Sequence, residues 1–287
     1  MSYRRRASPL HAARAAAGLA YCGALACAAL VLSAPLALAA VTAAIALAGV
    51  AAGVGRELRR AALLALPLGL LVAVINALVT RDGLTVIWRL GDLPVLGHTD
   101  VTLEATVYGG VLGLRAVALI LCGVLYTAAV DPDEVLKLFR RVSFRSALTA
   151  TLATRMVPIL IRDARRLADA QRCRADRPPT RLQLMRASTS GMLDRALDVA
   201  AALEVRGYGA ARRPPRARPP YSRHDVAFLA SAAAVLVLAV GARLADLTPF
   251  SAYPALHVPV HAGELGLAAA LVVCALLPFA DRRGVER

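Results

Sequence analysis

Residues 15–55 read AAAGLAYCGALACAALVLSAPLALAAVTAAIALAGVAAGVG, a stretch of 41 residues without one charged side chain. A single helix of this length would extend about 60 Å, twice the roughly 30 Å hydrocarbon core of a bilayer. Two helices joined by a tight reversal fit instead, and Pro35 marks the reversal because proline breaks the helical hydrogen-bond ladder. The stretch therefore predicts two membrane-spanning helices, at about 15–33 and 36–55.

Four further apolar stretches have about the length of a membrane span. They cover about 61–80, 105–130, 226–242 and 265–280, the last beginning near Ala262. Hydrophobic residues make up 58% of the chain but aromatic residues only 5%, a balance more typical of helices in lipid than of a soluble core. We predict an all-α polytopic membrane protein with about six transmembrane helices, four in residues 1–130 and two in residues 225–287.

The basic residues predict the orientation of these spans. The chain carries a net charge of +15 and 34 Lys and Arg residues. If the N-terminus is cytoplasmic and six spans alternate, the inside segments hold 30 of the 34; they are 1–14, 56–60, 131–224 and 281–287. The positive-inside rule then places both termini and the long segment 131–224 in the cytoplasm.

The cytoplasmic segment, residues 131–224, contains two to three amphipathic helices and no spanning run. A helix over about 146–175 shows an apolar stripe at helical spacing, formed by Leu148, Leu152, Met156, Ile159 and Leu167. Pro158 should kink this helix. A second helix over about 193–205 has a stripe formed by Leu193, Ala196, Ala200 and Leu203, and Gly207 follows as a stop. A shorter helix is expected over 133–141, and Pro-containing stretches at 176–181 and 212–220 should be irregular.

Both long helices end in an arginine beside small residues. The first ends QRCRA at 171–175 and the second ends LEVRGYG at 203–209. An arginine in the last turn can simply complement the helix dipole. Alternatively, its planar guanidinium can pair with carboxylates in a groove of a partner protein. The candidate residues for this contact are Arg174, Arg206, Arg172, Ala175, Gly207 and Glu204.

These ends resemble a known family. ADAQRCRAD at 168–176 and ALEVRGYGAARR at 202–213 resemble the Ala-Arg-Gly signatures that end the two coupling helices of the T component of energy-coupling factor (ECF) transporters, the EcfT/CbiQ family. ATRMVPIL at 153–160 and TLEATVYGGVLGLR at 102–115 also look like segments of that family. The sequence departs from the signatures at Cys173, Ala175 and Val205, so either Arg172 or Arg174 is the first signature arginine, and we take Arg174. The resemblance covers roughly residues 70–245.

The resemblance implies a non-enzymatic subunit of an importer in a prokaryotic plasma membrane. Two ATP-binding-cassette ATPases in the cytoplasm would bind ATP and Mg²⁺, and each would receive one signature arginine, Arg174 or Arg206. A membrane S component would bind the cargo, a vitamin or a transition-metal ion such as cobalt or nickel. The chain itself would hold no cofactor or metal and would contact only these partners and membrane lipids. Residues expected to pack the coupling helices are Leu148, Leu152, Met156, Pro158, Ile159 and Leu203.

Other readings stay open at this point. A stand-alone permease predicts several polar residues within the spans, and Asn76 and Arg115 stand out there. Arg115 would either contact another helix or extend to the membrane surface. A membrane-anchored protein that binds nucleic acid or anionic lipid through residues 155–223 is the other alternative; it predicts interleaved aromatic residues for stacking, and Tyr208 and Tyr221 are the only aromatic residues there.

Motifs for catalysis or metal binding are weak. The sequence has no Walker A or other Gly-rich phosphate loop and no Ser/His/Asp constellation, which argues against an autonomous ATPase or hydrolase. His257 and His261 are four residues apart, but Pro259 between them indicates a loop, so a metal site there is a weak prediction. The five cysteines form no CxxC pair and are read as small packing residues.

Overall fold

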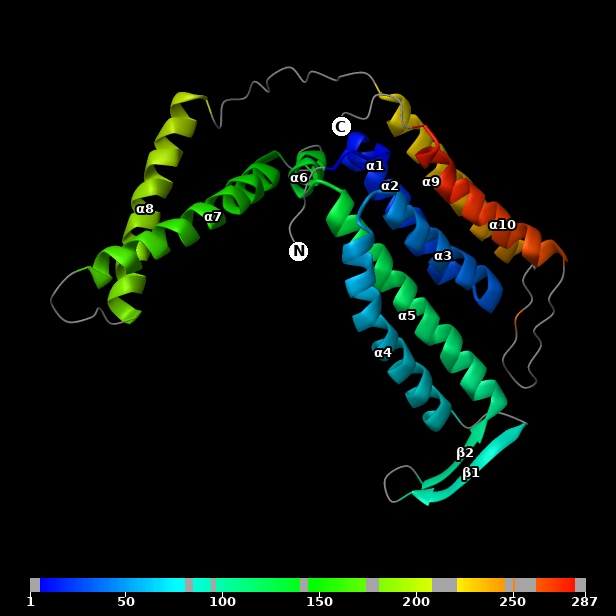
Figure 1. Cartoon of the computed structure of the whole chain (residues 1–287). Helices are drawn as coiled ribbons and strands as arrows, with labels where there is room; N and C mark the ends of the chain where they lie inside the picture. Colours follow the sequence, from blue (N-terminus) through cyan, green and yellow to red (C-terminus); the bar gives the residue numbers. More distant parts are fainter. Residues whose placement is uncertain are drawn as a thin grey trace. The chain divides into compact units, whose positions relative to one another are not determined.

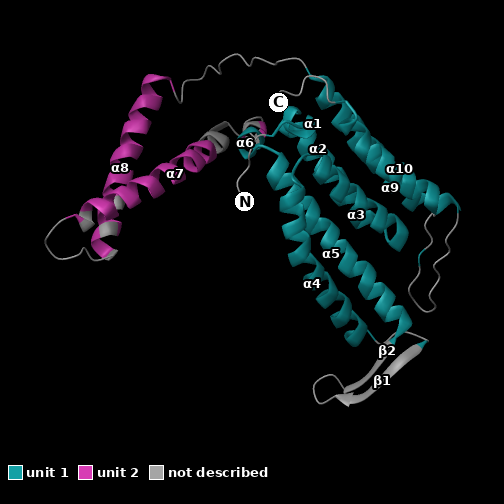
Figure 2. Cartoon of the chain, in the orientation of Figure 1, with its two compact units in different colours: residues 1–135, 221–287 teal, residues 136–220 magenta. Residues whose placement is uncertain are grey.

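The computed structural model divides the chain into two units (Figure 2). Unit 1 comprises Met1–Val135 and Tyr221–Arg287, and unit 2 comprises Leu136–Pro220. The residues that the structure describes are 6–80, 85–93, 97–139, 144–173, 181–207, 221–245, 250 and 262–281. Both predicted transmembrane parts, 1–130 and 225–287, fall in unit 1.

Where the structure describes it, unit 1 is built from six apolar helices (Figure 1). They are α2 (Ala15–Val31), α3 (Pro35–Ala51), α4 (Gly55–Val79), α5 (Leu103–Ala129), α9 (Arg223–Leu244) and α10 (Ala262–Leu276). The 3₁₀ turn η1 (Leu277–Phe279) extends α10, and the short helices α1 (Pro9–Ala12) and α6 (Pro132–Phe139) precede α2 and follow α5. By length and composition α4, α5, α9 and α10 with η1 can cross a membrane, whereas α2 and α3 are shorter. The predicted helical membrane fold is confirmed.

The reversal between α2 and α3 lies where the sequence predicts it. α2 ends at Val31, the backbone is extended at Leu32 and Ala34, and Pro35 is in the first turn of α3. Proline suits this position because the first amides of a helix have no intrahelical acceptor.

A small β-hairpin joins α4 to α5, an addition to the predicted helices (Figure 1). Strands β1 (Val86–Leu93) and β2 (Gly97–Thr102) pair antiparallel, with Val86 opposite Thr102 and Leu93 opposite Gly97. The sequence between these two spans, residues 81–104, is mixed and polar and contains the turn signals Asp82-Gly83 and Gly91-Asp92, so it indicates a loop with turns. The signal was present, since β1 begins with Val, Ile and Trp, residue types that favour strands.

α4 and α5 approach each other until their backbones touch. A Cβ atom added at Gly113 would lie 2.3 Å from the carbonyl oxygen of Gly69, and one added at Gly109 would lie 2.6 Å from that of Ala73. Gly109 and Gly113 form a GxxxG pattern on α5, and Gly69 and Ala73 have the same spacing on α4. Small residues at this spacing allow membrane helices to pack closely by dispersion and backbone contact.

An aromatic cluster joins α2, α9 and the end of α10. The rings of Tyr21, Phe228 and Phe279 meet edge to face, with centroids 5.2 to 6.2 Å apart. The Tyr21 hydroxyl donates a hydrogen bond of 2.8 Å to the carbonyl of Ala275, which satisfies the polar end of this buried ring. α2 is therefore fixed to both C-terminal helices within the core of unit 1.

Arg115, in the middle of α5, contacts another helix, one of the two roles considered for it. Its Nε donates to the carbonyl of Ala29 at 3.2 Å, and its Nη2 donates to the carbonyl of Leu32 at 3.0 Å. These carbonyls lie at the C-terminal end of α2, where the last carbonyls of a helix lack intrahelical partners. The guanidinium therefore caps α2 from the neighbouring span.

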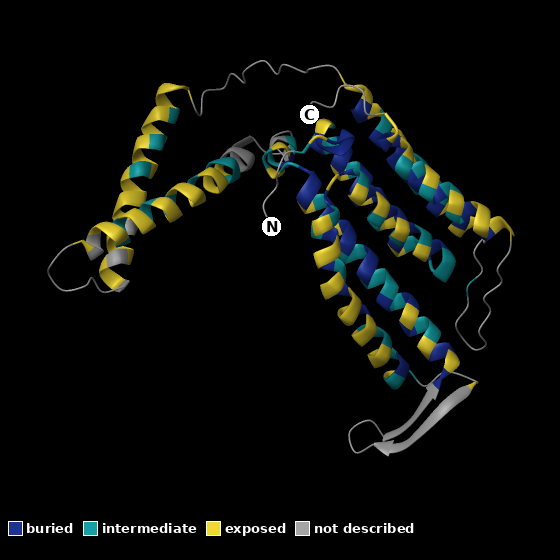
Figure 3. Ribbon diagram, viewed as in Figure 1, coloured by how far each residue is buried: buried dark blue, intermediate teal, exposed yellow. Residues whose placement is uncertain are grey.

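Buried positions gather where the helices of unit 1 face one another, while α4 is exposed over most of its length (Figure 3). α4 is the least buried of the four long spans. Arg56, Arg59 and Arg60 are exposed in its first turns, and beyond them the uncovered residues, apart from Pro67, are large and apolar: Leu63, Leu64, Leu66, Leu68, Leu70, Leu71, Val74, Ile75 and Val79. Such a face is suited to lipid acyl chains or to another membrane-embedded chain.

Candidate functional site: the ends of α7 and α8

In its described residues, unit 2 contains two long helices, the amphipathic α7 (Phe144–Arg172) and α8 (Arg181–Val205) (Figure 2). α8 begins at Arg181 and not near residue 193, which corrects the predicted start. The sequence 181–192 contains Ser188, Thr189, Ser190 and Gly191, which are poor helix formers, so local propensity hid this part of the helix. The Thr189 hydroxyl donates back to the carbonyl of Met185 at 2.9 Å, which satisfies its polar side chain within the helix.

An ion pair joins α7 to α8, and residues of both helices line an apolar groove. The Arg195 guanidinium donates a hydrogen bond to the Asp163 carboxylate. This hydrogen bond from Arg195 lowers the pKa of Asp163, and the charges of Arg195, Arg166 and Arg162 act in the same direction. A groove of about 500 Å³ lies beside the pair, and its apolar lining includes Leu160, Ala164, Leu167, Ala170, Ala187 and Met192. Opposite charges 32 residues apart give no local signal in a sequence, so this pair was not predicted.

The apolar stripe of α7 lies partly where the sequence predicts it. Leu152 and Met156 are half-buried, as is Leu167. Ile159 is 38% exposed, and its neighbour Leu160 lines the groove instead. Ile159 follows Met156 by three residues and Leu160 follows it by four. Adjacent side chains on a helix point about 100° apart, so these two lie on different faces, and the prediction chose the wrong one of the two.

The remaining predicted packing residues lie in different surroundings. Pro158 is exposed, and α7 is helical on both sides of it; the kink expected there stays a prediction. On α8, Leu203 is half-buried, whereas Leu193, Ala196 and Ala200 are exposed. The side chain of Leu148 lies outside the described part of the chain.

The C-terminal end of α8 presents an arginine at a sharp turn. α8 ends at Val205, and Gly207 adopts a φ of +76°, which confirms the predicted helix stop. The Gly207 amide donates to the carbonyl of Glu204 at 2.9 Å, and the Arg206 amide donates to that of Ala202 at 3.3 Å. Glu204, Val205 and Arg206 are all exposed, and among the described residues none pairs with the Arg206 side chain. The guanidinium is therefore available to a partner.

The end of α7 is described as far as Cys173. Arg172 is the last residue of the helix, and the amide of the exposed Cys173 donates to the carbonyl of Asp169 at 3.2 Å. Arg174 and Ala175 lie outside the described residues, as do the histidines at 257 and 261 and the Pro-containing stretches. The choice between Arg172 and Arg174 as the first signature arginine thus rests on the sequence alone.

Apolar helices in unit 1, four of them long enough to cross a membrane, together with a pair of long, largely exposed helices in unit 2, define an integral membrane protein. The family model described as CbiQ, cobalt transport protein, matches residues 6–216, which include every helix from α1 to α8. The chain belongs to this family and is a membrane transport component. A search of the curated proteins found no match.

Proposed function

We propose that the chain is the transmembrane coupling (T) subunit of an ECF-type importer. Two cytoplasmic ATP-binding-cassette ATPases bind ATP and Mg²⁺, and a membrane S component binds the cargo. The chain is not itself an enzyme. It passes the movement of the ATPases through α7 and α8 to the S component, in the plasma membrane of a prokaryote and with both termini in the cytoplasm.

The observation that carries the proposal is the exposed Arg206 at the end of α8. Gly207 ends the helix immediately after it, so the guanidinium projects from a helix tip and is not covered by a continuing helix. A planar guanidinium in that position can form paired hydrogen bonds with a carboxylate in a groove of an ATPase. Arg174 would make the equivalent contact with the second ATPase.

The cargo is a vitamin or a transition-metal ion. The description of the family favours a metal ion, cobalt, with nickel as its chemical neighbour. The S component, a separate chain, would recognise the cargo.

Co-purification tests the proposal. The chain is expressed with its ATPases and S component, and Arg174 and Arg206 are both changed to Glu. The matched control changes Arg165 and Arg186 to Glu; both are exposed arginines on the same two helices, away from the tips. The tip variant should lose the ATPases and metal uptake, whereas the control should keep both.

Two results would overturn the proposal. One is a tip variant that binds the ATPases and imports metal as well as the unmodified chain does. The other is metal uptake by the purified chain alone in proteoliposomes, which is the behaviour of a stand-alone permease.

A further inference from the structure

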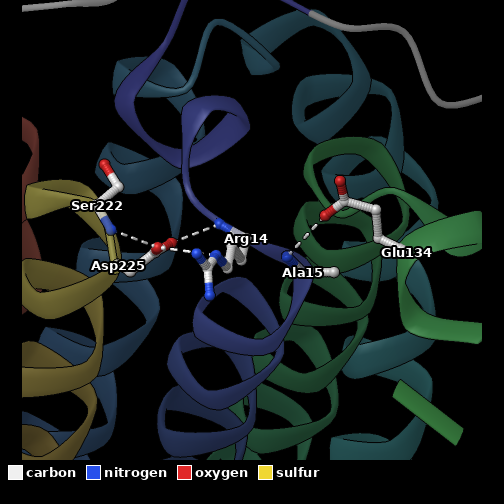
Figure 4. Close-up of polar contacts among 5 residues, drawn as sticks. All are labelled: Arg14, Ala15, Glu134, Ser222 and Asp225. Atoms are coloured by element: carbon white, nitrogen blue, oxygen red, sulfur yellow. Dashed lines mark hydrogen bonds and ion pairs between the residues drawn. The ribbon is translucent and has the colours of Figure 1, made fainter. Parts of the chain in front are cut away.

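The N-terminal end of α2 holds both connections to unit 2. The chain leaves unit 1 within α6, at Val135, and returns to it at Tyr221, just before α9. Figure 4 shows Arg14 and Ala15, where α2 begins, between Asp225 of α9 and Glu134 of α6. Two points that are 86 residues apart in the chain are thus held at one helix end.

Asp225 makes the stronger of the two connections. Its Oδ1 accepts a hydrogen bond of 2.7 Å from the Arg14 amide, and its Oδ2 accepts one of 2.9 Å from the Ser222 amide. The Nε of Arg14 lies 3.3 Å from Oδ2, and the Asp225 side chain is only 1% exposed. The Arg14 guanidinium also lies 4.9 Å from the ring centroid of Tyr221. Hydrogen bonds to a charged group are stronger than neutral ones, so this return point is firmly held.

Glu134 makes the second connection. Its Oε2 accepts a hydrogen bond of 3.2 Å from the Ala15 amide, and Val135 packs with Ala15 and Val130. The N-cap residue of α2, Arg14, has no side-chain cap of its own. Carboxylates from two other helices therefore serve the first turn of α2, where the free amides and the helix dipole favour negative charge.

We propose that these residues, Arg14, Ala15, Glu134, Tyr221 and Asp225, form a mount that transmits force from unit 2 into the membrane helices; we call them the α2 mount. The proposal rests on the coupling function proposed above. A segment held at one point can swivel, whereas a segment held at two points on one rigid element must pass its displacement on to that element. α2 carries the displacement into the core through the aromatic contacts of Tyr21 with Phe228 and Phe279. Arg14 and Asp225 are positioning residues in this scheme.

A purely stabilising role for Asp225 makes a different prediction, and a second helix cap separates the two roles. Thr102 caps α5 by accepting a hydrogen bond of 3.2 Å from the Ala105 amide, and it is as buried as Asp225, but it lies at neither connection to unit 2. Asp225→Asn and Thr102→Ala should each weaken the cap at a helix N-terminus. Only Asp225→Asn alters the mount.

The experiment uses the full complex in proteoliposomes and measures Co²⁺ uptake and ATP hydrolysis together. Asp225→Asn should keep the ATPases bound and hydrolysing ATP, while Co²⁺ uptake per ATP falls about tenfold, equivalent to one lost charge-assisted hydrogen bond. Thr102→Ala should keep the normal ratio. Arg14→Gln removes the guanidinium but keeps the backbone amide of residue 14, and it should also lower the ratio of Co²⁺ uptake to ATP hydrolysis. This variant replaces Asp225→Asn if the latter does not fold. Arg14→Lys, which keeps the positive charge, should have a ratio close to that of the unmodified chain.

An unchanged ratio in both Asp225→Asn and Arg14→Gln would overturn the mount, as would an equal fall in Thr102→Ala. Both results are obtained in a complex whose unmodified form assembles and couples, so they leave the proposed function standing. If the unmodified chain binds no ATPase, the proposed function fails and the mount fails with it.

Discussion

The contact between α4 and α5 predicts that adding a single methyl group at Gly113 destabilises the protein. The added Cβ would lie 2.3 Å from the carbonyl oxygen of Gly69 and 3.1 Å from its carbonyl carbon. An ordinary contact begins near 3.4 Å, so the two helices must separate by about 1 Å. The obstructing atoms belong to the backbone of α4, and no side chain can rotate away to relieve the clash.

Gly110, three residues before Gly113 on α5, provides the matched control. A Cβ there has no heavy atom within 4 Å. Both substitutions to Ala gain the same intrinsic helix propensity, about 1 kcal/mol. Overpacking at Gly113 costs about 1 to 3 kcal/mol, so the free energy of unfolding should differ between the two variants by that amount. Gly110→Ala should be as stable as the unmodified chain or more so.

The difference is measured by thermal unfolding of the purified variants in one detergent, supported by unfolding in increasing sodium dodecyl sulfate. Gly109→Ala gives a second test, since its Cβ would lie 2.6 Å from the carbonyl oxygen of Ala73. Equal stability of Gly113→Ala and Gly110→Ala would refute the close backbone contact.

Three further predictions follow from individual contacts. Arg115→Met removes both hydrogen bonds to the end of α2 and should lower the free energy of unfolding in detergent by about 1 to 3 kcal/mol, with Arg115→Lys losing less. Gly207→Ala places a Cβ at φ +76°, which costs about 1 kcal/mol, so hydrogen exchange over 203–207 should speed up, and less in Gly207→Asn. Burial lowers the pKa of His11 below 6.5, so the folded form favours neutral imidazole. Its stabilisation is complete above pH 6.5 and declines as pH falls through that value towards the folded pKa. The amides of segment 8–14 should therefore be less protected from hydrogen exchange, relative to their intrinsic exchange rates, at about pH 5.5 than at about pH 8 in the unmodified chain, whereas His11→Gln should show no such difference. A pH response that persists in His11→Gln would contradict the assignment.

Properties read from short stretches of the sequence were predicted well. The apolar helices follow from uncharged runs of near-membrane length, and the reversal before α3 follows from Pro35. Gly207 was recognised as a helix stop because only a residue without a side chain adopts its backbone conformation easily. The signature segments led to the family because they keep their order and spacing along the chain.

Faces and partners of the helices were predicted less well. Ile159 and Leu160 are both large and apolar, and the sequence does not say which one meets α8. The start of α8 was missed because Ser, Thr and Gly weaken local helix propensity, while contact with α7 supports the helix there. The small-residue pattern at Gly109 and Gly113 was visible in the sequence, and searching for close membrane-helix contacts would have found it.

Hydrophobicity, charge and backbone preference are local quantities, and in this protein they were sufficient for the helices, the turn at Pro35 and the arginine at the tip of α8. Folding alone selected the partners: Arg195 for Asp163, the α2 carbonyls for Arg115, and Arg14 with Ala15 for Asp225 and Glu134. Each of these pairs joins groups that lie 32 to 211 residues apart. Such contacts depend on how whole helices pack and cross, because a charged group accepts any complementary partner that packing brings within reach.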